Sequence, residues 1–256
     1  MEEDKKKKSI LYHAVLIILV VSGVFFGYKT YGILSEYYKA AKEYREIQEI
    51  AIKEVECEEE SEEKNIAVNF EELARINPDI VAWIRFEEPS IINYPIVQGA
   101  NNQKYLTTTF EGAENGAGCL YMDANNTGDF SDRNTFIYGH YKKNGHMFGS
   151  LGKYKDESYY KNHPFFDIYT PDGVKSRYRI FAVTVVDSDS DSYRKVYVNE
   201  EEYHNYLSMV KQLSLYETDV QVTGDASIVS LSTCTNVSRD ERLLIHAVRI
   251  NQSYEK

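Results

Sequence analysis

A cysteine and a histidine each stand directly after an apolar run, where a strand would hold the side chain at the edge of a cleft. Cys234 follows residues 228–233, and His140 follows residues 136–139. A thiol attacks as the thiolate, and an unperturbed cysteine, with a pKa of about 8.5, is little ionised at neutral pH. Its activation requires an imidazole or another cation that the fold brings close. The pattern indicates thiol chemistry, although a lone cysteine is more often structural.

Two arginines follow the cysteine and are candidates for a stabilising cation. Arg242 opens the apolar run 243–250, and Arg239 lies in the preceding loop. If these runs form neighbouring strands joined by a loop, the thiol and a guanidinium lie at the same end of the sheet. A guanidinium is permanently charged and can stabilise negative charge that develops on a carbonyl oxygen. From the residues alone, either arginine could be the stabilising cation.

The elements that must position these side chains are mostly short strands. Strand-like runs cover residues 80–86, 91–97, 118–122, 135–139, 165–169, 178–186, 227–232 and 243–250. Helical patterns are fewer and cover residues 70–76, 147–154 and 200–213. Many short strands with few helices predict a mainly β fold, a closed β-barrel of about eight strands with helical insertions.

The N-terminus has the pattern of a membrane anchor. Lysines occupy positions 5–8, and residues 10–27 form an apolar run without formal charge. As a helix rising about 1.5 Å per residue, this run reaches roughly 27 Å, enough for a bilayer core. The preceding lysines place the N-terminus in the cytoplasm and the remainder outside the cell. A cleaved signal peptide is the rival interpretation.

This pattern divides the chain into four parts. We expect a cytoplasmic tail at residues 1–9, a transmembrane anchor at 10–27, a helical and acidic stalk at 28–64, and a folded domain at 65–256. Residues 33–51 carry an apolar stripe at helical spacing, and residues 54–63 are an acidic run that we interpret as a solvated stalk.

Composition excludes several classes of function. Lys and Arg total 29 against 40 Asp and Glu, a net charge of −11, so the phosphate backbone of a nucleic acid would repel the chain. The three cysteines are too few for a disulfide scaffold, and their spacing fits no zinc ligand pair. We therefore expect no nucleic-acid partner and neither a metal nor an organic cofactor.

Four segments together resemble the sortases, membrane-anchored cysteine transpeptidases of Gram-positive bacteria. NTFIYGHYKKNGHMFGSL (134–151) and SIVSLSTCTNVSRDERLLIHAVRI (227–250) are similar to the His and Cys/Arg signatures of that family. INPDIVAWIRFEEPSIINYPIVQGANNQKYL (76–106) and GCLYMDANNT (118–127) resemble the opening strands of class B in particular. Two departures are minor: Ser230 replaces a usual threonine, and Cys119 stands where serine or alanine is common.

The resemblance implies a sortase-like barrel and a role for each candidate. Cys234 would be the nucleophile, His140 the general acid and base, and Arg242, rather than Arg239, the cationic stabiliser. The substrate would be the C-terminal sorting motif of a secreted surface protein, cleaved through a thioacyl-enzyme. The acyl group would pass to an amine of a peptidoglycan cross-bridge or a pilin.

Further polar residues near these signatures have two interpretations each. Tyr138, Ser232, Thr233 and Asp123 could border a substrate groove, whereas packing is the alternative for the first three and turn capping for Asp123. Cys119 is expected to pack as a small apolar residue, with a disulfide to Cys57 as the alternative.

Two other functions remain open from the sequence. A cysteine protease would use water as the acceptor, and an inactive anchored module would hold a peptide without turnover.

Overall fold

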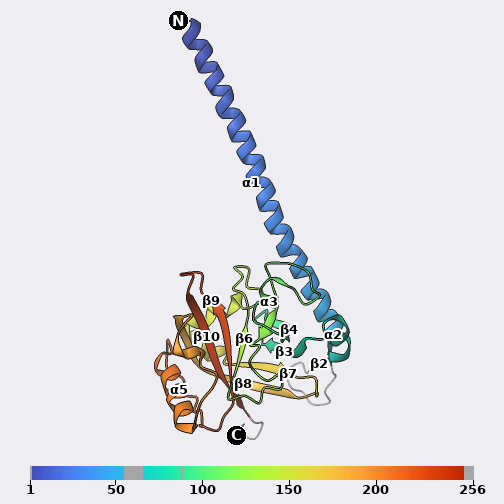
Figure 1. Cartoon of the computed structure of the whole chain (residues 1–256), viewed down its shortest axis with the longest axis vertical. Coiled ribbons are helices and arrows are strands. Elements are labelled where there is room, and N and C mark those ends of the chain that lie inside the picture. The colour runs from blue at the N-terminus through green and yellow to red at the C-terminus, as the bar shows by residue number, and fades with distance from the viewer. Residues whose placement is uncertain (1, 55–65, 88, 251–256) are drawn as a thin grey trace. The chain divides into compact units, whose positions relative to one another are not determined.

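The structure is a computed structural model that describes residues 2–54, 66–87 and 89–250. The chain divides into two compact units, Met1–Lys42 and Glu43–Lys256. The second unit holds every strand among the described residues. Two of these strands form a small separate sheet, and Figure 1 shows the others wrapped into a barrel.

Among the described residues, eight strands close into a barrel in the order β10-β8-β7-β3-β4-β5-β6-β9. Neighbouring strands are antiparallel except for the parallel pairs β4–β5 and β6–β9. The strands are β3 (Ile80–Phe86), β4 (Asn93–Val97), β5 (Leu120–Met122), β6 (Asn134–Tyr138), β7 (Phe165–Tyr169), β8 (Lys175–Asp187), β9 (Ile228–Cys234) and β10 (Glu241–Ile250). The closed β-barrel predicted from the strand-like runs is confirmed.

Short helices connect and cover the strands. Side-chain caps begin several of them. For example, Asn69 accepts a hydrogen bond from the backbone N–H of Glu72, and Asn199 accepts one from Glu202. The helices of the second unit are α2 (Phe70–Ile76), α3 (Lys104–Thr107), α4 (Glu157–Asn162) and α5 (Glu200–Gln212), with the 3₁₀ helices η1 (Gly149–Lys155) and η2 (Asp191–Tyr193).

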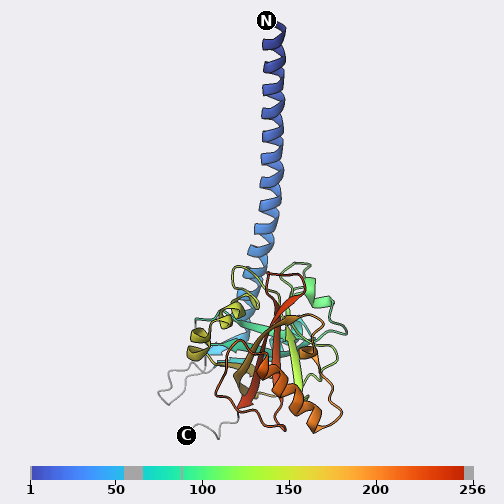
Figure 2. The same cartoon turned by 90° about the vertical axis from the view of Figure 1, so that its left-hand side faces the viewer.

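The insertion between β8 and β9 carries η2 and α5 and covers one side of the barrel. Tyr203, Tyr206 and Val210 of α5 are buried against residues of β8, β9 and β10, including Phe181 and Ile228. Figure 2 shows α5 (orange) along the outside of the barrel. The helical pattern at residues 200–213 thus corresponds to α5, and these buried residues form its packing face.

The first helix, α1 (Glu2–Ala51), is continuous through the predicted anchor and into the predicted stalk. Its segment Leu11–Ala51 contains a stretch long and apolar enough to cross a bilayer, with a mean hydropathy of 2.1. An apolar N-terminal helix of this kind is consistent with membrane anchoring.

The predicted stalk does not extend over residues 43–54, because these residues belong to the second compact unit. Tyr44, Ile47 and Ala51 are buried, and the Tyr44 hydroxyl donates a 2.6 Å hydrogen bond to the carbonyl of Gly118. Strand β1 (Ile52–Glu54) then pairs with β2 (Ile66–Val68). The apolar stripe is thus, in this part, a packing face of the folded domain. Residues 55–65, which include most of the acidic run and Cys57, lie outside the described residues.

Candidate active site

Strand β9 lies between β6 and β10, and its pairing sets the positions of the three candidate residues on neighbouring segments of the barrel. On one side, Arg242 of β10 is the Cα partner of Cys234. On the other side, Tyr138 of the parallel strand β6 pairs with Ser232, and the Gly139 N–H donates a 3.1 Å hydrogen bond to the Ser232 carbonyl. His140 lies two residues after Tyr138, and Cys234 lies two residues after Ser232, so the two residues hold equivalent positions beyond this pair.

Directly paired residues of adjacent strands point to the same face of a sheet. The register therefore places Cys234 and Arg242 on one face at the C-terminal end of β9, and extending the β6–β9 register by two residues adds His140 to that face. All three are half-buried, so each is held by its surroundings and still reachable from solvent. Such a group combines a thiol, an imidazole and a guanidinium, which are the components of nucleophilic acyl transfer.

The imidazole of His140 is oriented by the backbone. Its Nε2 lies 2.6 Å from the carbonyl oxygen of Leu106. Because a carbonyl oxygen accepts hydrogen bonds and cannot donate them, Nε2 carries the hydrogen, and Nδ1 is the basic atom of the neutral ring. Within the described residues, no hydrogen bond joins this ring to Cys234, and catalytic hydrogen bonds often tighten when substrate is bound.

The pKa of His140 lies below its ordinary value. Burial, which disfavours the charged ring, is the main cause, and the nearby Lys142 ammonium adds to it, while the hydrogen bond to Leu106 opposes the change. The free protein therefore holds His140 mainly neutral at pH 7, the form that takes a proton from a thiol or an amine.

The guanidinium of Arg242 is held by the loop that precedes its strand. Its Nη1 donates hydrogen bonds to the carbonyl oxygens of Arg239, at 2.8 Å, and Glu241, at 3.1 Å. Arg239 itself is exposed and contributes a backbone acceptor here. The structure thus distinguishes between the two candidate arginines, because Arg242 is the one that pairs with Cys234.

Two tyrosines near the thiol were missed by the sequence analysis. Burial raises the pKa of Tyr121 to about 12, with further contributions from the charges of Asp123 and Cys234, while Arg242 acts in the opposite direction. The Tyr193 hydroxyl, from the insertion, lies 2.7 Å from Ser232 Oγ. Tyr121 lies in the segment GCLYMD, which could have indicated a place near the site, but no local pattern indicated Tyr193.

Asp123, one of the candidate groove residues, is fully buried behind the site. Its carboxylate accepts hydrogen bonds from the Tyr138 hydroxyl at 2.9 Å and from Asn102 at 3.0 Å, and it pairs with Lys195. It also caps its own turn, accepting from the Asn125 N–H at 2.9 Å. Burial tends to raise the pKa of Asp123, but Lys195 and the other donors outweigh it and lower the pKa.

The remaining candidates differ in access. Ser232 and Thr233 are each 3% exposed, so their side chains lie beneath the surface. Tyr138 is half-buried, with its ring 5.2 Å from that of Tyr121. A role for Ser232, Thr233 or Asp123 in substrate binding would therefore act through neighbouring groups, and such roles stay predictions.

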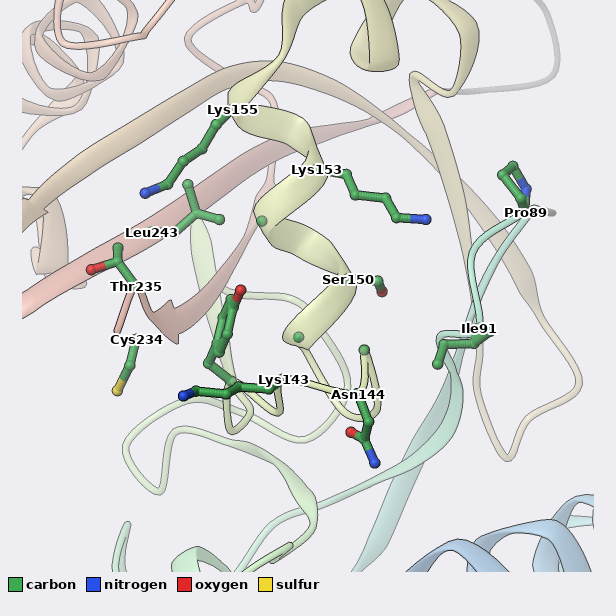
Figure 3. Close-up of a pocket in the computed structure, with 14 residues that line it drawn as sticks. Pro89, Ile91, Lys143, Asn144, Ser150, Lys153, Lys155, Cys234, Thr235 and Leu243 are labelled. Carbon is green, nitrogen blue, oxygen red and sulfur yellow. The ribbon is translucent and has the colours of Figure 1, made fainter. Parts of the chain in front are cut away.

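A pocket of about 570 Å³ opens beside the thiol (Figure 3). Its described lining comes from the β3–β4 loop, the segment after His140, helix η1, and the ends of β9 and β10. These residues are Pro89, Ile91, Tyr141, Lys143, Asn144, Gly145, Gly149, Ser150, Gly152, Lys153, Lys155, Cys234, Thr235 and Leu243. His140 and Arg242 are not among them, so the pocket adjoins the group of three at Cys234.

The second thiol in the described residues is unsuited to nucleophilic chemistry. Cys119 is buried, and burial raises its pKa to about 12. It packs as the sequence analysis expected, with its sulfur 3.9 Å from the Pro95 carbonyl oxygen. Among the described residues, no group of three or more His, Cys, Asp or Glu side chains could hold a metal ion.

Comparison with known proteins agrees with this geometry. A family model described as the sortase domain matches residues 87–250. Sortase B of Staphylococcus aureus (strain NCTC 8325 / PS 47) is 30% identical over 220 residues, which are 86% of this chain and 88% of that protein. Sortase B of Listeria monocytogenes is 36% identical over 163 residues, which are 64% of this chain and 65% of that protein.

Solved structures agree as well. The crystal structure of sortase B from B. anthracis in complex with AAEK1 superposes with a TM-score of 0.74 at 33% identity and covers 86% of this chain and 100% of that one. A Staphylococcus aureus sortase B-substrate complex has a TM-score of 0.67 at 31% identity and covers 72% and 85%.

The barrel, the cysteine at the end of β9 and these matches define a cysteine transpeptidase, and the chain belongs to the sortase family. Within that family it is a class B sortase, as the resemblance of residues 76–106 and 118–127 predicted.

Proposed function

We propose that Cys234 is the nucleophile of the transpeptidase, that His140 is its general acid and base, and that Arg242 stabilises the developing oxyanion. The observation that supports this proposal is the register of β6, β9 and β10. Arg242 pairs with Cys234, and Tyr138, two residues before His140, pairs with Ser232, two residues before Cys234.

The reaction has two halves. The Cys234 thiol first gives its proton to the neutral His140 ring. The thiolate then attacks the carbonyl carbon of the scissile peptide bond, and the oxygen becomes an anion that Arg242 and nearby backbone N–H groups bind more strongly than the ground state. The C–N bond then breaks, and His140 gives its proton to the leaving amine. In the second half an acceptor amine attacks the thioacyl carbon, His140 takes its proton, and the sulfur leaves as thiolate.

The donor is a sorting-motif peptide of a secreted surface protein, and the acceptor is an amine of a peptidoglycan cross-bridge or a pilin. Relatives whose structures are described as a sortase B-substrate complex and as sortase B complexed with triglycine support a peptide donor and a small amine acceptor.

The second compact unit acts outside the cell, held by α1 in the membrane with its N-terminus in the cytoplasm. The lysines at positions 5–8 support this orientation. Protease treatment of intact cells should remove an epitope placed after residue 250 and spare one placed at residue 1. The reverse result would contradict the orientation.

The test of the chemistry is the fate of the acyl group. The full chain in detergent is incubated with a library of sorting-motif peptides and increasing concentrations of an amine, and the products are identified by mass spectrometry. We expect the amine adduct to replace the hydrolysis product as amine rises. Hydrolysis alone at every amine concentration would mean a protease.

Two substitutions test the assisting residues. His140→Ala and Arg242→Ala should each lower the transfer rate by about two to four orders of magnitude, since each removes a proton carrier or the stabilisation of the oxyanion. Arg239→Ala removes the same charge from the same loop and is the matched control, with a rate close to that of the unmodified chain. Equal losses of transfer rate in both arginine variants would show that Arg242 does not have the proposed role of stabilising the oxyanion.

A further inference from the structure

Three lysines line the pocket beside Cys234 without an anionic partner. Lys143 lies in the segment after His140, and Lys153 and Lys155 are on η1. All three are exposed, and within the described residues none of them forms an ion pair; Lys153 Nζ lies 5.5 Å from the ring centroid of Tyr159. The described lining also contains no Asp or Glu. In a chain of net charge −11, this concentration of positive charge marks a site for an anion.

A buried hydroxyl in the same lining gives a second, independent indication of a ligand. Ser150 is only 6% exposed, and its Oγ has no hydrogen-bond partner among the described residues. Buried polar atoms in native proteins nearly always have a partner, so an exception in a pocket wall indicates a ligand or a water molecule. A hydroxyl beside ammonium groups suits an oxyanion, which accepts hydrogen bonds from both.

Glycines keep the pocket open between its walls. A Cβ on Gly145 would approach Ile91 Cδ1 to 3.4 Å, and one on Gly152 would approach the Tyr141 ring to 3.3 Å. Figure 3 shows Lys143 and Lys155 on the side of η1 that carries Cys234, and Lys153 and Ser150 on the side of Ile91. A ligand lying over this glycine-lined stretch would reach from the thiol to the unpartnered hydroxyl.

We propose that this pocket binds the acceptor, and that the acceptor is an amine whose own molecule carries a carboxylate. Lys153 and Ser150 hold the carboxylate on the side of Ile91, while Lys143 and Lys155 flank the amine on the side of Cys234. This inference rests on the proposed function, because it assigns one of the two substrates to one side of the nucleophile. Tyr121 and Tyr193 also lie near Cys234, and neither of them lines this pocket.

The charges of the pocket also suit the chemistry of an amine nucleophile. An amine attacks in its neutral form, and neighbouring positive charges favour that form by disfavouring protonation. The same charges attract the carboxylate of the acceptor molecule. The pocket would thus hold the molecule by one end and keep the other end reactive.

Binding without turnover tests the inference directly. The full chain in detergent is titrated by calorimetry at low salt with triglycine and with triglycine amide, which share the amine and differ in the carboxylate. We expect triglycine to bind about fivefold more tightly, because several partly exposed charge pairs each contribute modestly. Equal affinity for the two peptides would overturn the inference.

Matched variants locate the preference. Replacing Lys143, Lys153 and Lys155 together by Gln should bring the affinity ratio close to one, and Ser150→Ala should lower it. Lys161→Gln changes the charge in the same direction, but this lysine pairs with Glu157 outside the pocket, so the ratio should stay near fivefold. A fivefold affinity ratio that is unchanged in the triple variant would contradict the proposed site.

Turnover separates this inference from the proposed function. In the triple variant, the triglycine concentration that gives half-maximal transfer should rise about fivefold, whereas the value for triglycine amide should not. A loss confined to the rate of thioacyl formation would overturn the acceptor assignment. Absence of any thioacyl on Cys234 would contradict the proposed function, and the binding ratio would still decide whether the pocket holds the carboxylate.

Discussion

His246 lies on the same strand as Arg242, but its ring is completely buried. The Ser230 hydroxyl donates to Asn134 Oδ1 at 2.8 Å, so Ser230 Oγ accepts from His246 Nδ1, also at 2.8 Å. The neutral ring then leaves Nε2 without a partner within the described residues. A proton on Nε2 would create a buried cation without an acceptor, and burial accordingly lowers the pKa of His246 to about 3.

This residue should make the fold sensitive to acid. In the unfolded chain the ring takes up a proton below a pKa of about 6.5, whereas the folded chain resists protonation down to about 3. The resulting stability is complete above pH 6.5 and is lost as the pH falls toward 3, by about 5 kcal/mol in total. His246→Asn, which keeps a donor for Ser230, should flatten this part of the curve of unfolding free energy against pH, measured with urea.

The exposed His204 of α5 provides the control, because His204→Asn should leave the acid dependence unchanged. An equally steep loss of stability in His246→Asn would show that other groups cause it.

At the scale of elements, a buried ion pair joins the insertion to the strands of the site. Asp123, directly after β5, holds Tyr138 of β6 and pairs with Lys195, which follows η2. Tyr193, from the same insertion, holds Ser232 of β9. Tyr138 precedes His140 by two residues, as Ser232 precedes Cys234, so these contacts support both sides of the site.

Removing the carboxylate should therefore affect both stability and rate. Asp123→Ala leaves Lys195 and the donors on Tyr138, Asn102 and Asn125 without their acceptor. We expect a loss of about 3 kcal/mol in urea unfolding. The rate of thioacyl formation should also fall, by roughly tenfold, because His140 loses its support.

Asp219→Ala is the comparison, since this carboxylate pairs with Arg179 at a side-chain exposure of 76%. An exposed pair of this kind contributes about 1 kcal/mol or less. Similar effects of the two variants would exclude a special role for Asp123.

The sequence predicted helices and strands wherever the pattern of apolar residues within the segment itself indicated them. The bounds predicted for α2, β3 and β7 agree with the structure. The Cys, His and Arg candidates could be named because each stands directly before or after an apolar run. The pairing of Asp123 with Lys195 and the approach of Tyr193 to Ser232 join segments far apart in the chain, so no local pattern could reveal them. The three-residue strands β1 and β2 are too short to produce a period.

At the scale of the whole molecule, the position where the folded unit begins is the main difference from the sequence analysis. The stripe of α1 was assigned to a stalk because a helical period does not reveal what covers an apolar face. Tyr44, Ile47 and Ala51 are in fact buried in the second compact unit.

Fragments of the chain test this boundary. A fragment that begins at residue 65 lacks these side chains and the partner of β2, and we expect it to melt roughly 10 °C below a fragment that begins at residue 28. A fragment that begins at residue 36 retains them and should melt with the longer one. Equal melting temperatures for the fragments beginning at 28 and 65 would restore the stalk interpretation.

The central claim, that Cys234 forms a covalent acyl intermediate, is tested most directly by mapping that intermediate. The full chain is quenched in acid during turnover of a sorting-motif peptide, digested, and sequenced by mass spectrometry. We predict that the acyl half of the peptide is attached to Cys234, that an added amine removes it, and that Cys234→Ala abolishes it while Cys119→Ala does not. Turnover that persists in Cys234→Ala, or an acyl group attached to Cys119, would contradict the account.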